Sequence, residues 1–370
     1  SLLTRAGRFL ACDPWQRGRW GYILFSFRPI AGKIGCNSAH RLYFFAFIMP
    51  NLAHKISQNN IALVCIIVLL GILAHAGTLS SPFKTLDDNF SIVNNPDIKD
   101  PSGMGKIFTK SFFGGGHYYR PMVSLSFWAE YQCFGLRPFF YNLTNVGLHL
   151  AVAVIVFFLM LLLLEDRVVS FFVSLLFAVH PIHWEAVSNI PGRAVILSAF
   201  FTINAFFFFC LSRQRKQFAV FYVLSLVLFA CGLLSKESAA MLPAVLLGYL
   251  FFAAKGAKRY SLTLPFFALV IAYIFLRRTL GFVEIYPWRT PQEHVLGFFT
   301  FLTACLTYLG LFIWPVGLHF DRAQPMFLKF SDPGLFSTLI AVAALAVGLI
   351  RSSKRLPGSA KFFMAWFCLE

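Results

Sequence analysis

The feature that most constrains this chain is a series of long apolar segments separated by short charged loops. The segment at residues 61–79 is long enough to cross a hydrocarbon core about 30 Å thick. A mean hydropathy of +0.70 and a charged fraction of 13% exclude an ordinary soluble globular protein. The sequence therefore predicts an all-α polytopic membrane protein with about 9–11 transmembrane helices. Further spans are expected near residues 141–164, 168–183, 194–211, 218–234, 239–254 and 261–276.

The charges of the loops predict how the chain is oriented. Lys55 and the loops at 165–167, 213–216 and 255–259 should be cytoplasmic, because basic loops stay on that side. Residues 79–131 then form a large extracytoplasmic loop, with interfacial helices expected at 101–113 and 122–134. The unusual polar clusters are then predicted on the extracytoplasmic face, opposite the basic loops. Among them are Glu130 and the pair Arg277 and Arg278.

Three further segments complete the expected architecture. Residues 295–315 are interpreted as a re-entrant or obliquely packed segment with both ends outside, because a simple span would place the basic residues 351–355 on the wrong side. A span follows at 334–350. Another begins at Phe362, and the end at Glu370 suggests truncation.

The first 48 residues contain seven Arg or Lys and one acid, Asp13, without sustained periodicity. Three interpretations remain open: sequence that precedes a natural start at Met49, a basic cytoplasmic tail, or a targeting segment. Residues 49–370 are expected to form the transmembrane domain.

Net charge and cysteine spacing exclude other classes of function. The charge of +17 lies in short loops and in the first 48 residues, which indicates membrane topology rather than a nucleic-acid surface. The eight cysteines form no CxxC pair, so neither a disulfide framework nor a cysteine zinc site is indicated.

Asp87 and Asp88 directly follow the first predicted span. An acidic pair at this place is consistent with catalytic work, and also with simple solvation or a turn.

A second polar cluster is the HPIHWE stretch. His180, His183 and Glu185 have donor types that zinc accepts, but Pro181 disrupts the helical face that would direct both rings together. The alternatives are a hydrogen-bonded helix cap or the lining of a substrate cavity. No metal or other cofactor is predicted to be required.

Cationic residues at the same face could hold an anion. Lys236 beside Glu237 is either a snorkelling interfacial pair or a point charge for phosphate, whereas Arg120 and Arg193 offer bidentate forks. The chain has no Walker loop, no GxGxxG after a strand and no GxSxG.

Taken together, several ordered motifs resemble one family, the transmembrane and tetratricopeptide-repeat O-mannosyltransferases and their prokaryotic relatives, of the GT-C glycosyltransferase superfamily. The resemblance covers about residues 61–370. The motifs are Asp87-Asp88, Asn94-Asn95-Pro96, Tyr119-Arg120-Pro121, Asn142 with Asn145 and His149, residues 177–187, Gly192-Arg193, residues 235–238 and residues 314–321.

This resemblance implies a glycosyltransferase that uses a polyprenyl-phosphate sugar, with the catalytic acid in the first extracytoplasmic loop. Mannose or a similar sugar would pass to a hydroxyl of a protein, glycan or lipid acceptor. One residue of the pair Asp87 and Asp88 would be the general base, because two close like charges tend to raise one pKa. Residues 192–195 depart from the expected pattern, and the tetratricopeptide repeats are absent from this sequence. Arg120, Arg193 and Lys236 would bind the donor phosphate, and Glu130, His180, His183, Glu185, Glu237 and Asp321 would line or support the cavity.

The alternative function is a transporter or flippase of lipid-linked substrates. Such proteins more often show internal repeats and charged or broken helices at the bilayer midplane. Here the polar residues cluster at one face, which favours the enzyme. Sugar, acceptor, anomeric outcome and oligomeric state are not predicted.

Overall fold

The computed structural model describes residues 59–84, 87–113, 116–254, 259–282, 290–319, 322 and 324–369. These residues belong to one compact unit, His54–Glu370. Residues 1–48, Lys55, residues 255–258 and Asp321 lie outside the described residues, so the predictions about them stay predictions.

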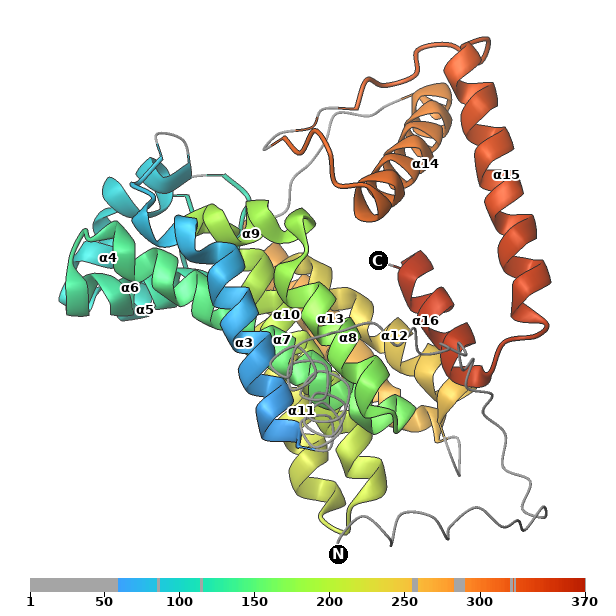
Figure 1. The fold of residues 1–370 in the computed structure, drawn as a ribbon. Helices are drawn as coiled ribbons and strands as arrows, with labels where there is room; N and C mark the ends of the chain where they lie inside the picture. The colour runs from blue at the N-terminus through green and yellow to red at the C-terminus, as the bar shows by residue number, and fades with distance from the viewer. Residues whose placement is uncertain are drawn as a thin grey trace, which may run out of the picture. The chain divides into compact units, whose positions relative to one another are not determined.

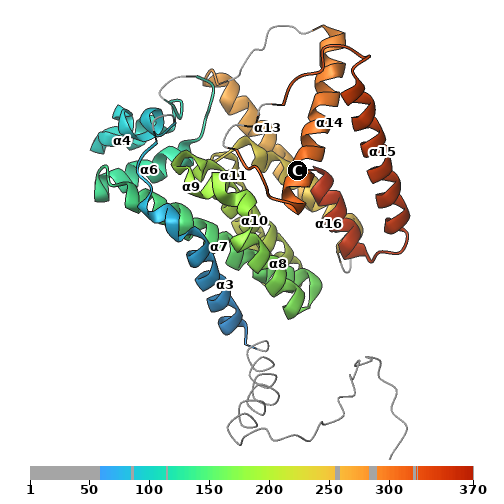
Figure 2. The ribbon, with the colours of Figure 1, turned by 45° about the horizontal axis from the view of Figure 1, so that its top comes forward.

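Every regular element among the described residues is helical (Figures 1 and 2). The first part of the chain contains α3 (Asn60–His75), η2 (Ala76–Ser80), η3 (Asn89–Val93), α4 (Pro96–Lys99), η4 (Pro101–Gly103), α5 (Met104–Ile107), α6 (Pro121–Phe134) and α7 (Pro138–Leu164). The middle part contains α8 (Arg167–Val179), η5 (Pro181–His183), α9 (Trp184–Ser188), η6 (Ile190–Gly192), α10 (Arg193–Gln214), α11 (Phe218–Leu233), η7 (Glu237–Met241), α12 (Leu242–Gly248) and η8 (Tyr249–Ala253). The last part contains η9 (Tyr260–Thr263), α13 (Leu264–Thr279), α14 (Pro291–Ile313), α15 (Pro333–Ser353) and α16 (Gly358–Leu369).

The predicted membrane character is confirmed. Six helices of the described residues are long and apolar enough to cross a membrane, and a seventh candidate is the bent pair of α8 with Pro181–Ser188. The count is lower than the predicted 9–11 because α11 and the segment Glu237–Ala253 are shorter apolar helices. Residues 291–313 form one continuous α-helix, which contradicts a re-entrant backbone there, whereas the alternative of an obliquely packed segment stays a prediction.

The bundle is held by polar contacts between helices as well as by apolar packing. The hydroxyl of Ser174 donates to the carbonyl of Ala153 at 2.6 Å, and that of Ser225 donates to the carbonyl of Ala205 at 2.6 Å. Such side-chain bonds are common between helices in lipid, where backbone carbonyls have no water to bind. They join α7 to α8 and α10 to α11.

Phenylalanine fills the centre of the bundle. Phe206, Phe209, Phe229 and Phe266 are fully buried, and the rings of Phe209 and Phe266 meet edge to face at 5.8 Å. Aromatic pairs prefer this geometry to a face-to-face sandwich. Part of the large phenylalanine content therefore packs the protein interior rather than facing lipid.

The chain bends by 43° between α8 and η5, where Pro181 follows His180. Pro181 has no backbone N–H to continue the helical ladder. The N–H of Ile182 turns instead to Nδ1 of His180, so the carbonyl of Ala178 loses its helical donor. Ring nitrogens of His75 and His149 lie 3.2 and 3.1 Å from that carbonyl. The break expected from the sequence is thus stabilised by two histidines of other helices.

A group of short helices precedes α7. In both views α4, α5 and α6 gather at one end of α3 and α7 (Figures 1 and 2). A helix expected at 122–134 is observed as α6, whereas 101–113 contains only the short helices η4 and α5; the interfacial position of these segments stays a prediction. The end of the bundle that carries these helices also carries the polar clusters named above.

Candidate active site

Arg193 is the first residue of α10, and its side chain is fully buried. Its Nε donates to Oδ1 of Asn145 at 2.7 Å, and Nη2 donates to the carbonyl of Tyr141 at 2.8 Å. Its Nη1 donates to Oε2 of Glu130 at 2.5 Å and to the hydroxyl of Ser126 at 3.2 Å. Arg193 therefore joins three helices, α6, α7 and α10, at a single point.

These contacts correct the role predicted for Arg193. Four of the five guanidinium N–H groups are used within the protein, and the ring of Phe127 covers its face at 4.5 Å. A donor phosphate has no access to such a group. Glu130, expected to line or support the cavity, is the buried counter-ion of Arg193.

Asn145 extends this connection toward the bend. Its amide nitrogen lies 3.2 Å from the carbonyl of Asn189 and 3.3 Å from that of Ile190. These carbonyls sit where α9 ends, and helix ends leave such groups without helical partners. Gly192 fits this turn closely, because a Cβ there would lie 2.5 Å from the carbonyl oxygen of Ala186.

The loop with the acidic pair is attached to the same turn. The ammonium of Lys84 donates to the carbonyl of Ser188 at 2.9 Å, and the hydroxyls of Thr78 and Ser188 are 2.7 Å apart. The amide of Asn142 donates to the carbonyl of Ser81 at 2.8 Å. Hydrogen bonds thus run from Arg193 through Asn145 and the end of α9 to the acidic loop.

The structure gives the two acids different environments. Asp88 is 1% exposed, and its Oδ2 accepts the backbone N–H of Lys84 at 2.5 Å, while Oδ1 is buried without a partner among the described residues. Burial raises the pKa of the Asp88 carboxyl; the backbone N–H and the ammonium of Lys84 lower it, and the charge of Asp87 raises it. Asp87 is half-buried, and its carboxylate has no hydrogen-bond partner among the residues described around it. Asp87 is therefore the more accessible of the two.

A basic cluster lies where α6 begins and α13 ends. Arg120 and Arg277 approach opposite oxygens of Glu237 at 3.7 and 3.5 Å, which is longer than a hydrogen bond. Nε of each arginine is buried without a partner among the described residues. Burial and the nearby Arg120 lower the pKa of Lys236, whereas Glu237 and Glu185 raise it. The cluster therefore holds more positive charge than Glu237 neutralises and has unused donors.

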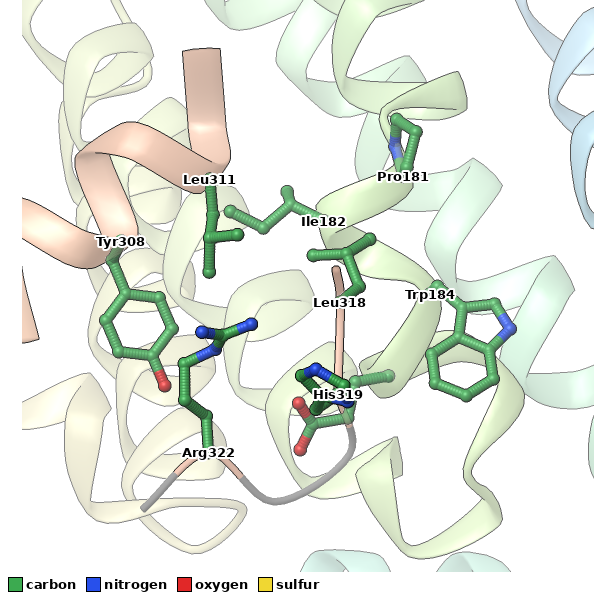
Figure 3. A pocket seen from close by; sticks show the side chains of 9 residues that line it. Pro181, Ile182, Trp184, Tyr308, Leu311, Leu318, His319 and Arg322 are labelled. Atoms are coloured by element: carbon green, nitrogen blue, oxygen red, sulfur yellow. The ribbon is translucent and has the colours of Figure 1, made fainter. Parts of the chain in front are cut away.

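A cavity of about 210 Å³ adjoins the bend after α8 (Figure 3). Tyr308 reaches into it from α14, and Arg322 extends between Tyr308 and His319 (Figure 3). Trp184 stands at its edge, and the ammonium of Lys84 lies 5.4 Å from the centre of the Trp184 ring. The remaining lining residues are Pro181, Ile182, Glu185, Leu311 and Leu318.

For the HPIHWE stretch, the sequence left open a metal site, a helix cap or the lining of a cavity. His180 bonds to the carbonyl of Phe312 at 3.0 Å and caps η5, and the ring of His183 packs on Phe177 at 4.5 Å. Among the described residues no group of three His, Cys, Asp or Glu could hold a metal ion. The alternative of a metal bound by His180, His183 and Glu185 therefore has no geometric support, whereas Glu185 lines the cavity as expected.

A second cavity of about 290 Å³ opens beside the basic cluster. Glu237 and Arg277 form its polar side, and the rest is apolar or aromatic. Its other lining residues are Ala240, Val270, Tyr273, Ile274 and Phe282. The site thus combines a polar cavity, a basic cluster and a mainly apolar cavity.

Sequence reasoning missed some of these residues. The sequence placed Arg277 on the face opposite the basic loops but assigned it no role. Arg277 follows Tyr273 by four residues on α13, so the two side chains share one helical face. Tyr308 and Arg322 had no local signal, whereas His319 lies in the motif at residues 314–321 but was given no role. The fold of α14 and the following segment brings all three to the bend after α8. Asp321 lies outside the described residues.

Comparison with known proteins finds several protein O-mannosyl-transferases. The chain is 32% identical to the mouse protein O-mannosyl-transferase TMTC3 over 293 residues, which cover 76% of this chain and 30% of the relative. It is 29% identical to the nematode protein O-mannosyl-transferase F38B6.6 of Caenorhabditis elegans over 279 residues, 70% of this chain and 39% of the relative. It is 35% identical to human TMTC1 over 184 residues, 44% of this chain and 20% of the relative.

The chain is related to the TMTC family of protein O-mannosyl-transferases. The resemblance stated from the motifs is thereby confirmed. The chain spans 20–39% of the length of these three TMTC-type relatives. No family model matches the chain, and no solved structure matches it.

The buried ion pair of Arg193 and Glu130 should contribute to the free energy of unfolding, and this can be tested. We expect Glu130→Ala to lower the free energy of unfolding by about 3–5 kcal/mol, because it leaves a buried guanidinium without its counter-ion. The double variant Glu130→Met with Arg193→Met should recover much of this loss, since it removes both buried charges. Thermal unfolding in detergent is the measurement.

Lys110→Met provides the control. It removes the partner of Asp97 in an exposed ion pair, and such pairs contribute about 0–1 kcal/mol. If Glu130→Ala changes the unfolding temperature no more than Lys110→Met does, Arg193 does not organise this end of the bundle.

Proposed function

We propose that this chain forms the membrane-embedded catalytic part of a GT-C-type protein O-mannosyltransferase. The donor would be a mannosyl polyprenyl phosphate, and the acceptor a serine or threonine hydroxyl of a protein. The reaction would take place on the extracytoplasmic face, at the end of the bundle with α4, α5 and α6. The names of the relatives, protein O-mannosyl-transferases, support mannosyl transfer to protein.

One structural observation carries the proposal: two arginines with unused donors stand at the same end of the bundle as an accessible acid. Arg193, by contrast, is fully buried and uses four of its five N–H groups within the protein, so a ligand has no access to it. Arg120 and Arg277 approach the carboxylate of Glu237 at 3.5–3.7 Å, and Lys236 adds a third positive charge. Nη2 of Arg277 also donates to the backbone carbonyls of two other residues at 3.0 Å, but Nε of each arginine remains without a partner among the described residues. Guanidinium and ammonium groups arranged in this way are suited to a phosphate.

The chemistry assigns complementary roles to the two clusters. The acceptor oxygen attacks the anomeric carbon, the carboxylate of Asp87 takes the hydroxyl proton, and the bond from that carbon to the phosphate oxygen breaks. Polyprenyl phosphate leaves with the electron pair of that bond. Arg120, Arg277 and Lys236 stabilise the charge that develops on the leaving phosphate.

The cavities suggest where the parts of the donor lie. The cavity of about 210 Å³ offers aromatic faces from Trp184 and Tyr308 and charged groups from Glu185 and Arg322, a combination suited to a hexose. The cavity of about 290 Å³ offers Val270, Ile274 and other apolar groups next to Arg277, which suits the first isoprenoid units beside the phosphate. Glu185 raises the pKa of Lys236, so the wall of the first cavity and the basic cluster interact.

The position of the charges favours this proposal over a transporter. Arg120 caps the start of α6, Glu237 begins η7, and Arg277 is in the last turn of α13. These are ends of helices, whereas transporter sites lie near the bilayer midplane on broken helices.

The acidic pair is tested by substitution without change of size. Asp87→Asn should lower turnover at saturating donor by about 10²- to 10⁴-fold, because it removes the general base. Asp88→Asn should have a smaller effect, since its carboxyl holds the loop and is not exposed. Turnover of purified enzyme with a mannosyl polyprenyl phosphate and an acceptor peptide is the measurement.

Asp97→Asn is the matched control, because Asp97 lies in the same loop and pairs with Lys110 at the surface. It should keep nearly normal turnover. Normal turnover of Asp87→Asn would remove Asp87 from the mechanism, and a greater loss in Asp88→Asn than in Asp87→Asn would move the base to Asp88.

The basic cluster is tested by its effect on donor binding. Arg120→Gln and Arg277→Gln should each raise the KM for the donor about 10-fold or more, because a hydrogen bond to a charged group contributes about 1.5–3 kcal/mol. Donor titrations at fixed acceptor measure this. Arg278→Gln is the control, since the exposed Arg278 adjoins Arg277 on α13. Equal donor KM values for Arg277→Gln and Arg278→Gln would exclude the cluster as the phosphate site.

A further inference from the structure

A third cavity lies away from the site described above, between η8, α15 and α16. Its volume is about 420 Å³, within the range of roughly 300–1,000 Å³ typical of ligand pockets. Most of its lining is apolar, and the polar exceptions are Ser353 and Lys361. The apolar lining residues are Phe252, Leu349, Ile350, Met364 and Ala365.

The side of this groove formed by η8 and α16 is fixed by close packing. A Cβ at Gly358 would collide with the carbonyl of Phe252, so the start of α16 lies directly against η8. One turn later Phe362 is 1% exposed, and its ring meets those of Tyr249 and Phe206 edge to face at 5.9 and 5.8 Å. The side of the groove formed by η8 and α16 is therefore shaped without a ligand.

Positive charge gathers at one end of the groove. Arg351 is in the last turn of α15, Lys354 caps that helix, and Arg355 follows it. With Lys361 they make four cations, and none of the four forms an ion pair with a described residue. Residues 333–369 contain no Asp or Glu. The positive charge here is consequently not neutralised by acids of the same segment.

The surroundings determine which kind of anion can reach the groove. α15 is one of the helices that are long and apolar enough to cross a membrane. Ile350 of this helix lines the groove, and its side chain is 62% exposed. The basic end of such a helix lies at the level of the lipid headgroups. A ligand at this place comes from the bilayer and has an apolar chain and a negative headgroup.

We propose that this groove binds an anionic phospholipid, with an acyl chain along Ile350 and Met364 and the phosphate at Lys361. The site is separate from the transferase site and does not depend on the proposed activity. Each lysine or arginine near an anionic headgroup strengthens binding by about fivefold. Four such residues beside a preformed apolar groove give both attraction and a place for the chain.

Native mass spectrometry of the purified protein in detergent tests the proposal. Phosphatidylglycerol and phosphatidylcholine with the same acyl chains are added at equal concentration. We expect one preferred phosphatidylglycerol adduct in the unchanged protein, about fivefold weaker binding in Lys361→Gln, and recovery in Lys361→Arg. Met364→Trp, which fills the groove without a change of charge, should also remove the preferred adduct.

Lys329→Gln is the control, because it removes one exposed cation from residues 324–332, far from this groove in sequence. It should bind phosphatidylglycerol like the unchanged protein, and unfolding temperatures check that each variant is folded. Equal binding of both lipids, or equal loss in Lys329→Gln and Lys361→Gln, would overturn the proposal. It would also fail if a polyprenyl phosphate displaced phosphatidylglycerol from the groove, because the site would then be one for the donor.

Discussion

The hydrogen bonds of the buried Arg193 guanidinium are the interactions on which the polar end of this bundle depends. Burial of an unpaired charge is prohibitively costly, so the chain must bring partners to it from elsewhere in the fold. Glu130 comes from α6, and Asn145 and the carbonyl of Tyr141 come from α7. α6 is thereby fixed against the membrane helices, and with it Arg120 at the start of α6.

The same network explains how a loop far from Arg193 in sequence is held in place. Asn145, the partner of Arg193, also donates to the carbonyls at the end of α9. The carbonyl of Ser188 in that turn accepts a hydrogen bond from the ammonium of Lys84. Asp88 then holds the backbone of Lys84. Arg193 therefore positions the acidic loop and does not bind a ligand, whereas Arg120 and Arg277 each keep an unused donor. The difference between a fully buried arginine and two arginines with an unpaired Nε is the physical basis of the proposed phosphate site.

Hydropathy predicted the helices well, because an apolar run that must cross lipid leaves few alternatives to a helix. The expected segment 141–164 is observed as Pro138–Leu164, and 218–234 as Phe218–Leu233. The role of Arg193 could not be predicted in this way. A Gly-Arg pair at the end of a span has the same sequence whether the arginine is free or paired, and its partner Glu130 is 63 residues away. The same limit applies to Arg322, which reaches the cavity only through the fold of α14 and the segment that follows it.

A cryo-EM structure of the protein with a bound polyprenyl-phosphate sugar analogue tests the central claim most directly. The account predicts density for the phosphate within hydrogen-bond distance, about 2.7–3.2 Å, of Arg120 or Arg277, with Arg193 still bound to Glu130. Phosphate density on Arg193, or at the opposite end of the bundle with the basic cluster empty, would contradict it.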